Sequence, residues 1–225
     1  MPTLILLRHG QSMWNQRNIF TGWVDVPLSS QGIEEAIAAG KKIADTPIDC
    51  VYTSTLVRAQ QTAMIAMAQH QSNVVAVIQH EDAPELANQS QIKSDEEKAN
   101  TIPTYIDWRL NERYYGDLQG FNKTATAEKF GADQVKLWRR SYNVAPPGGE
   151  SLEMTCERTL PCLNERIIPA LDSGQNILVS AHGNSLRSIV MEIEQLTEAE
   201  VLNLEIPTGI PRSYEYSNQQ WQPIK

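Results

Sequence analysis

Three strand-like apolar runs in the sequence are each followed by polar side chains that could do chemistry. The runs cover residues 4–7, 50–54 and 176–181. The side chains that follow them include Arg8, His9, Arg58 and His182. In an open parallel sheet, ligands bind outside the carboxyl ends of the strands, where helix N-termini offer backbone donors. We therefore expect these two arginines and two histidines to meet in one crevice.

The chemistry of this set favours phosphate over a metal. A single Arg-His-Gly turn is most often an ordinary polar turn, but a His-Gly turn follows two of the three runs. Neither turn contains Asp or Glu, and the sequence has no HxH or HExxH spacing. Arg donates two hydrogen bonds to phosphoryl oxygens, and an imidazole nitrogen can attack phosphorus. The set predicts phosphoryl transfer in which fixed cations stabilise the transition state by several kcal/mol, on the order of what such groups supply.

Helical periodicity follows each strand-like run and indicates how these residues are positioned. The helical stretches are 30–44, 55–69 and 185–195. In the first of them, the spacing predicts one buried face made by Ile33, Ile37, Gly40 and Ile43. Strands that alternate with helices predict parallel pairing and an α/β sandwich.

The length predicts one domain, 1–225, with one polar surface excursion. Residues 81–107 are acidic and lack periodicity, so we expect a solvated loop with at most one short helix. Two short helices should be separated by Gly131. The apolar spacing over 150–171 predicts a long helix that is kinked at Pro161.

Composition excludes several classes of protein. A net charge of -8 and a pI of about 5.1 disfavour nucleic acid as the main partner. No apolar run approaches the ~20 residues of a membrane span, and the start lacks the pattern of a signal peptide, so we expect a cytoplasmic protein. Three cysteines without CxxC spacing argue against a disulfide framework and a structural zinc site.

Six longer motifs occur along the chain: LLRHGQSMWNQRNIFTGWVDVPLSSQG, YTSTLVRAQQTA, LNERYYGDLQGFNK, WRRSY, AHGNSLRSIV and EIPTGIP. By these motifs the chain resembles the cofactor-dependent phosphoglycerate mutases of the histidine phosphatase superfamily. RHG alone marks the superfamily, whereas FTGW, LNERYYG, NK, WRR and IPTG together are far more specific. The resemblance implies a three-layer α/β sandwich with a mainly parallel central sheet.

Site roles follow from the same resemblance. It implies that His9 is phosphorylated and that the phosphoryl group is held by Arg8, Arg58 and His182. It implies further donors at Ser12, Asn15, Thr21, Gly22, Gly183 and Asn184. Substrate carboxylate and second phosphate would be bound by Arg113, Tyr114, Tyr115, Lys123, Arg139 and Arg140. Glu112 would exchange the proton of the substrate hydroxyl, and we expect the nearby phosphate to raise its pKa.

The activity implied is interconversion of 3-phosphoglycerate and 2-phosphoglycerate, primed by 2,3-bisphosphoglycerate and needing no metal. The partners expected are small anionic phosphoglycerates, with no nucleic acid and no membrane, and the protein should be a monomer or homodimer. One alternative is a metal-independent phosphatase of small phosphoesters such as phosphoserine, and another is a noncatalytic module that binds a phospho-ligand. Lys123, Arg139 and Arg140 favour the mutase. The short turn PPGGES and the short end of the chain relative to longer mutases predict some hydrolytic leakage.

Overall fold

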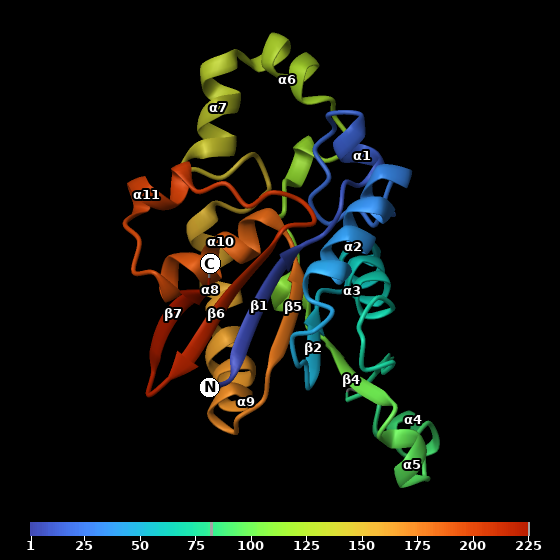
Figure 1. Ribbon diagram of the computed structural model, residues 1–225. Coiled ribbons are helices and arrows are strands. Elements are labelled where there is room, and N and C mark those ends of the chain that lie inside the picture. Colours follow the sequence, from blue (N-terminus) through green and yellow to red (C-terminus); the bar gives the residue numbers. More distant parts are fainter. Residues whose placement is uncertain (82, 225) are drawn as a thin grey trace.

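The computed structural model describes residues 1–81 and 83–224 (Figure 1). Within these residues seven strands form one sheet, in the order β3-β4-β2-β5-β1-β6-β7. The strands are β1 (Thr3–Arg8), β2 (Cys50–Thr53), β3 (Val75–Ile78), β4 (Thr101–Ile106), β5 (Ile177–Ala181), β6 (Pro211–Ser217) and β7 (Gln220–Ile224). The first five in the spatial order pair in parallel, which confirms a mainly parallel sheet.

Helices cover both faces of the sheet, which confirms a three-layer α/β sandwich (Figure 1). The helices are α1 (Met13–Gln16), α2 (Ser30–Lys42), α3 (Val57–Met67), α4 (Pro84–Gln89), α5 (Asp95–Lys98), α6 (Lys123–Phe130), α7 (Ala132–Arg140), α8 (Leu152–Cys162), α9 (Ile168–Asp172), α10 (Gly183–Ile193) and α11 (Glu198–Asn203). Successive residues of β1 face opposite sides, so Leu4 packs with α8 to α10 while Ile5 packs with α2 and α3. The central strands are buried on both faces, as their continuous apolar runs predict.

Helix α2 buries only part of the predicted face, since Gly40 and Ile43 are buried as expected but Ile33 is not. Ile33 is 43% exposed, and the buried residues are Gly32, Ala36, Ala39 and Gly40. A Cβ atom at Gly40 would lie 2.4 Å from the carbonyl oxygen of Ala66, so the backbones of α2 and α3 approach closely here. Small residues are therefore selected at the contact, and the expectation that Ile33 is buried is wrong.

The predicted surface excursion is wrong for residues 101–106, and its remainder contains two short helices where at most one was expected. Residues 101–106 form β4, which lies inside the sheet between β3 and β2. Ile102 and Thr104 are buried. The β-branched side chain of Thr favours a strand, but Thr counts as polar in a hydropathy pattern, so the pattern did not indicate one here. The preceding α4 and α5 contain no buried residue and form the exposed part of the connection.

The long helix at 150–171 is interrupted at the predicted proline. Helix α8 ends one residue after Pro161, and residues 163–167 form one turn of π-helix between α8 and α9. Pro has no N–H to donate within the helix, so the ladder of hydrogen bonds shifts at this point. The predicted break at Gly131 is also confirmed, because this residue has a φ of 90° between α6 and α7.

The terminal hairpin of β6 and β7 was not predicted. These strands run antiparallel, and Asn218 and Gln219 connect them with φ values of 50° and 62°. Two left-handed residues define the tight hairpin turn that matches the twist of the strands. Asn favours this conformation but Gln does not, so the sequence carries only half of the usual turn signal.

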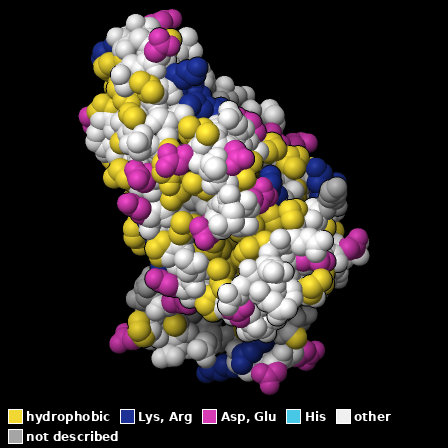
Figure 2. Space-filling model, turned by 90° about the vertical axis from the view of Figure 1, so that its left-hand side faces the viewer, with side chains coloured by type: hydrophobic (Ala, Val, Ile, Leu, Met, Phe, Trp, Pro, Cys, Tyr) yellow, Lys and Arg dark blue, Asp and Glu magenta, His cyan; other side chains and the backbone are white. Residues whose placement is uncertain are grey.

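The surface shown in Figure 2 agrees with the acidic composition, since Asp and Glu side chains are scattered over it and Lys and Arg form only small groups. Among the described residues, no helix is long and apolar enough to cross a membrane. Cys50, Cys156 and Cys162 are buried and unpaired, and burial raises the pKa of Cys50 to about 12.

Candidate active site

His9 follows β1 and is 2% exposed. Its Nδ1 lies 2.6 Å from the carbonyl oxygen of Gly10, which can only accept, so Nδ1 carries the proton. Burial and then the charges of Arg58 and Arg8 hold the pKa of His9 well below its usual range. The ring is therefore neutral, and its Nε2 has a lone pair 3.4 Å from Nε of Arg58. A neutral, fixed imidazole of this kind can act as a nucleophile.

His182 follows β5 at the start of α10, and its ring centroid lies 4.9 Å from that of His9. Ser54 places its Oγ 2.7 Å from Nε2 of His182, while Nδ1 has no partner among the described residues. Burial, Arg58 and His9 lower the pKa of His182 well below its usual range. When the Ser54 hydroxyl donates to Nε2, Nδ1 carries a proton that can be donated to an anion.

The two arginines are held by backbone carbonyl groups. Arg58 donates to Gly22 at 2.8 Å and to Val24 at 3.1 Å, and Arg8 donates to Ile206 at 2.8 Å. Burial lowers the pKa of Arg58 to about 10, which leaves it charged at neutral pH. Nε of Arg8 is buried without a partner in the described part of the chain, as is Nδ1 of His182. Buried donors normally find acceptors, so these two fit a phosphoryl group.

Glu112 is 9% exposed, and its Oε1 accepts hydrogen bonds from the backbone N–H groups of Arg113 and Asn184 and from the Asn184 side chain. Burial alone would raise the pKa of Glu112, but Arg8, these donors and Arg58 together lower it to about 2. The expectation of a raised pKa concerned the carboxyl group beside a bound phosphate, and it stays a prediction. It did not include the donors that fold around the carboxylate and lower its pKa without that phosphate.

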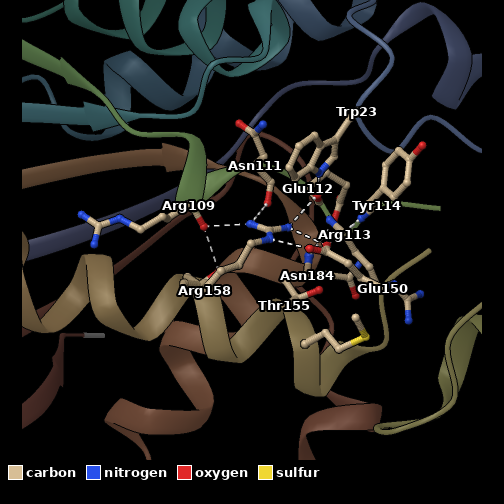
Figure 3. Close-up of polar contacts among 12 residues, drawn as sticks. Trp23, Arg109, Asn111, Glu112, Arg113, Tyr114, Glu150, Thr155, Arg158 and Asn184 are labelled. Carbon is tan, nitrogen blue, oxygen red and sulfur yellow. Dashed lines mark hydrogen bonds and ion pairs between the residues drawn. The ribbon is translucent and has the colours of Figure 1, made fainter. Parts of the chain in front are cut away.

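The loop that carries Glu112 is fixed from below by Arg158 of α8, which the sequence did not single out (Figure 3). Arg158 donates to the carbonyl oxygens of residues 109, 111 and 112 and pairs with Glu150 at 2.8 Å. Trp23 donates from its Nε1 to the carbonyl oxygen of Glu112 at 2.5 Å. These contacts fix the backbone at Glu112, and only the folded chain brings them together.

One cavity of about 150 Å³ unites most of the predicted residues, and its size suits a small molecule. Its wall contains Arg8, His9, Asn15, Thr21, Gly22, Arg58, Glu112, Tyr115, Lys123, Arg139, Arg140, Gly183 and Asn184. It also contains four residues that the sequence reading missed: Ile19, Arg187, Glu205 and Ile206. Arg187 follows Asn184 by three positions on α10, and this helical spacing was a signal that could have found it.

His182 does not line this cavity, although its ring lies beside that of His9. Three residues predicted to bind the substrate also lie outside the cavity wall. Ser12 is buried and caps α1 by accepting from the N–H of Asn15. Tyr114 packs edge-on against Trp23, with ring centroids 5.5 Å apart. Arg113 is 1% exposed and donates to the hydroxyl of Tyr115, a residue that does line the cavity. Ser12, Tyr114 and Arg113 therefore support neighbouring residues of the site and do not line the cavity themselves.

The described residues contain no group of three or more His, Cys, Asp and Glu side chains that could hold a metal ion. The cavity wall holds six cationic side chains and two carboxylates, so its own composition suits an anion. The cations are Arg8, Arg58, Lys123, Arg139, Arg140 and Arg187, and the carboxylates are Glu112 and Glu205.

The fold and this site define a class of protein. Residues 4–91 and 91–225 match the histidine phosphatase superfamily (branch 1), and the chain belongs to this superfamily. A solved mycobacterial structure, glucosyl-3-phosphoglycerate phosphatase, shares the fold with a TM-score of 0.74 at 21% identity, covering 100% of this chain and 98% of that one.

Within the superfamily, the chain belongs to the 2,3-bisphosphoglycerate-dependent phosphoglycerate mutase family. It is 56% identical over 221 residues to the protein of that name from Chlamydia muridarum, covering 98% of this chain and 96% of the relative. The corresponding protein of Chlamydia trachomatis serovar L2b is 58% identical over 221 residues, with the same coverage.

Proposed function

We propose that the protein interconverts 3-phosphoglycerate and 2-phosphoglycerate through a phosphohistidine at His9, primed by 2,3-bisphosphoglycerate. The observation that carries the proposal is one cavity with two kinds of anion-binding group. Next to His9 lie Arg8 and His182, each with a buried donor that has no partner among the described residues, and the cavity wall also presents Lys123, Arg139 and Arg140. We further propose a cytoplasmic protein that acts on small anionic phosphoglycerates as a monomer or homodimer.

The first half-reaction forms the phosphoenzyme. Nε2 of His9 attacks the phosphorus, the N–P bond forms as the P–O bond breaks, and the leaving oxygen takes a proton from Glu112. Arg8 and Arg58 stabilise the charge that builds on the phosphoryl oxygens. The doubly anionic phosphoryl group raises the pKa of Glu112 from its low starting value while it is bound, which allows the carboxyl group to be protonated when the acid is needed.

The second half-reaction reverses these steps on a different hydroxyl. Glu112, now ionised, removes the proton of that hydroxyl, its oxygen attacks phosphorus, and His9 leaves as a neutral imidazole. Between the two steps the substrate must turn without leaving the site. Lys123, Arg139 and Arg140 hold its other anionic group during this reorientation.

The alternative function, a metal-independent phosphatase of small phosphoesters such as phosphoserine, would use the same phosphohistidine and transfer it to water. It has no need for a second set of cations. A noncatalytic module that binds a phospho-ligand is disfavoured, because a neutral His9 beside an ionised Glu112 provides a nucleophile and a base that mere binding would not require.

A substrate panel separates these functions. For the unmodified protein we expect interconversion of the two phosphoglycerates to exceed release of phosphate from phosphoserine. Lys123→Glu or Arg139→Glu should lower mutase activity by at least about tenfold more than hydrolysis of a small phosphoester, since the affected charges bind the remote anionic group. Lys129→Glu is the matched control, because it reverses a charge on the same helix α6 outside the cavity wall. Equal losses in both activities, or faster hydrolysis of phosphoserine by the unmodified protein, would favour the phosphatase.

A further inference from the structure

Arg187 and Glu205 line the cavity but have no part in the reaction described above. Arg187 comes from α10, and Glu205 lies in the segment after α11. The carboxylate of Glu205 pairs with Arg140 at 3.1 Å and lies 3.9 Å from Arg187. These contacts join three elements of the fold at one part of the cavity wall.

Arg187 is a desolvated cation with incomplete pairing. Its side chain is 13% exposed, and Nε donates to the carbonyl oxygen of Leu204 at 2.8 Å. The other contacts are longer: 3.4 Å to Oδ1 of Asn184 and 3.9 Å to Glu205. A buried guanidinium normally has close acceptors for its remaining donors, because removal from water is costly. Nη1 and Nη2 of Arg187 are therefore placed to accept a stronger anionic partner.

Glu205 is suited to be replaced as that partner. Its side chain is 68% exposed, so breaking its pairs returns the carboxylate to water at little cost. The backbone on both sides is fixed, since Leu204 accepts from Arg187 and Ile206 accepts from Arg8. Only the side chain of Glu205 needs to move for an anion to reach Arg140 and Arg187.

The two parts of the cavity differ in the arginines that act on them and share the influence of Glu112. Arg58 and Arg8 lower the pKa of His9, whereas burial and then Arg140 lower the pKa of Arg187, and Glu205 and Glu112 raise it. A ligand with a single phosphate at His9 has no second anionic group to pair with Arg187 or to displace Glu205. A ligand with anionic groups at both ends reaches both parts.

We propose that Arg187, together with Arg140, binds the anionic group of the substrate that is not being transferred, and that Glu205 is the resident counter-ion which this group displaces. The inference rests on the proposed function. Glu205 then sets how strongly the site prefers ligands with two anionic groups, because its charge opposes them and leaves a lone phosphate unaffected. Glu205 is a positioning residue that acts through the two arginines.

Calorimetric titration of full-length His9→Gln protein, in which covalent transfer is blocked, tests the proposal with three probes. They are 2,3-bisphosphoglycerate, inorganic tripolyphosphate and inorganic phosphate. Glu205→Gln should tighten the first two by about two- to fivefold, the scale of one exposed ion pair, and leave phosphate unchanged. Arg187→Gln should weaken the first two by about tenfold, with partial recovery in Arg187→Lys.

Glu192→Gln is the matched control, because Glu192 is exposed on α10, lies outside this cavity wall and forms no ion pair with the described residues. In protein with His9 intact, the Glu205→Gln change should appear in KM for phosphoglycerate, with kcat kept within about twofold. Since Glu205 is exposed, this arm remains informative if Arg187→Gln fails to fold.

The outcomes separate the inference from the proposed function. Equal shifts for phosphate and tripolyphosphate, or no shift in Glu205→Gln, would overturn the inference even if mutase activity is present. Absence of bisphosphoglycerate binding together with a tripolyphosphate affinity that depends on Glu205 would overturn the mutase and support the counter-ion role.

Discussion

Before a phosphate binds, His9 and Glu112 are both deprotonated, and the same arginines favour both states. Arg8 and Arg58 lower the pKa of the imidazole and of the carboxyl group, because a nearby cation favours the deprotonated form of each over its protonated form. The site therefore presents a nucleophile and a base without a metal ion nearby. This coupling explains why two buried arginines sit against a buried histidine, an arrangement that would otherwise only cost stability.

The roles of His9 and Glu112 can be separated by labelling. His9→Ala should abolish labelling by 2,3-bisphosphoglycerate, because no nucleophile remains. Glu112→Gln should still be labelled but turn over about 10²- to 10⁴-fold more slowly, the usual contribution of a proton-transfer group. Acid-labile phosphate on His9→Ala, measured by rapid quench, would show that another residue is the nucleophile.

The buried histidines predict how stability depends on pH. Burial lowers the pKa of His9 and of His182, so below about pH 6.5 the unfolded chain binds protons that the folded chain does not. The free energy of unfolding should therefore fall as pH falls below 6.5, by up to about 1.4 kcal/mol per pH unit for each histidine. His182→Gln should reduce this slope between pH 7.5 and 5.5 in urea denaturation.

His80→Gln is the control for that experiment, because His80 is exposed and removing it changes the histidine count without changing the site. A slope that is the same in His182→Gln and in the unmodified protein would mean that His182 is protonated in the folded state.

At the scale of elements, the turn after β1 is fixed by direct backbone contact with α2. A Cβ atom at Gly32 would lie 2.0 Å from the carbonyl oxygen of Gln11, and one at Gly10 would lie 2.2 Å from that of Gly32. No flexible side chain is available to yield at either contact. The position of His9 thus depends on the absence of two side chains.

Gly32→Ala should destabilise the protein although Ala favours helices. The helix propensity would add about 1 kcal/mol of stability, but the overlap with the backbone should cost more, about 1–3 kcal/mol net. The shifted turn should also slow labelling of His9. Ser30→Ala, at an exposed position of the same helix turn, is the control for thermal melts and labelling rates. An unchanged or raised melting temperature in Gly32→Ala would show that α2 can move away freely.

The strands that the sequence predicted are those buried on both faces. Strands β1, β2 and β5 have continuous apolar runs, and such runs are typical of strands whose two faces are both shielded from water. Strand β4 was not predicted, because Thr101, Pro103 and Thr104 interrupt its apolar residues. Its burial comes from neighbouring strands that are distant in the sequence. Hairpin β6–β7 escaped because its turn lacks glycine.

The site was predictable to the extent that its chemistry is local in sequence. The residues of the RHG, NER and HGN motifs meet as expected, because parallel strands and their loops end at one edge. Ser54 and Arg158 contribute by contacts that only the tertiary fold creates. The low pKa of Glu112 also arises only in the folded chain, because four separate donors and cations produce it.

At the scale of the whole molecule, charge is distributed unevenly between surface and site. The chain carries a net charge of -8, yet the cavity wall has six cationic side chains. An acidic surface repels polyanions, whereas the enclosed cations attract a small anion that fits between them. The molecule therefore selects its ligands by size as well as by charge.

Activity should survive EDTA, because protein cations supply the charge stabilisation that a metal would provide. Vanadate, which adopts the five-coordinate geometry of phosphoryl transfer, should inhibit strongly. Both are measured by mutase assay after dialysis against chelator. Loss of activity that Mg²⁺ or Mn²⁺ restores would contradict the assignment of these arginines.

The connection with α4 and α5 leaves the sheet at the end away from α6 and α7 (Figure 1). It has no buried residue in either helix. Doubling the length of such a connection costs only about 0.6 kcal/mol. Evolution can therefore lengthen or shorten the chain here while the catalytic chemistry stays under strict selection, and a protein engineer can insert a reporter peptide at the same place.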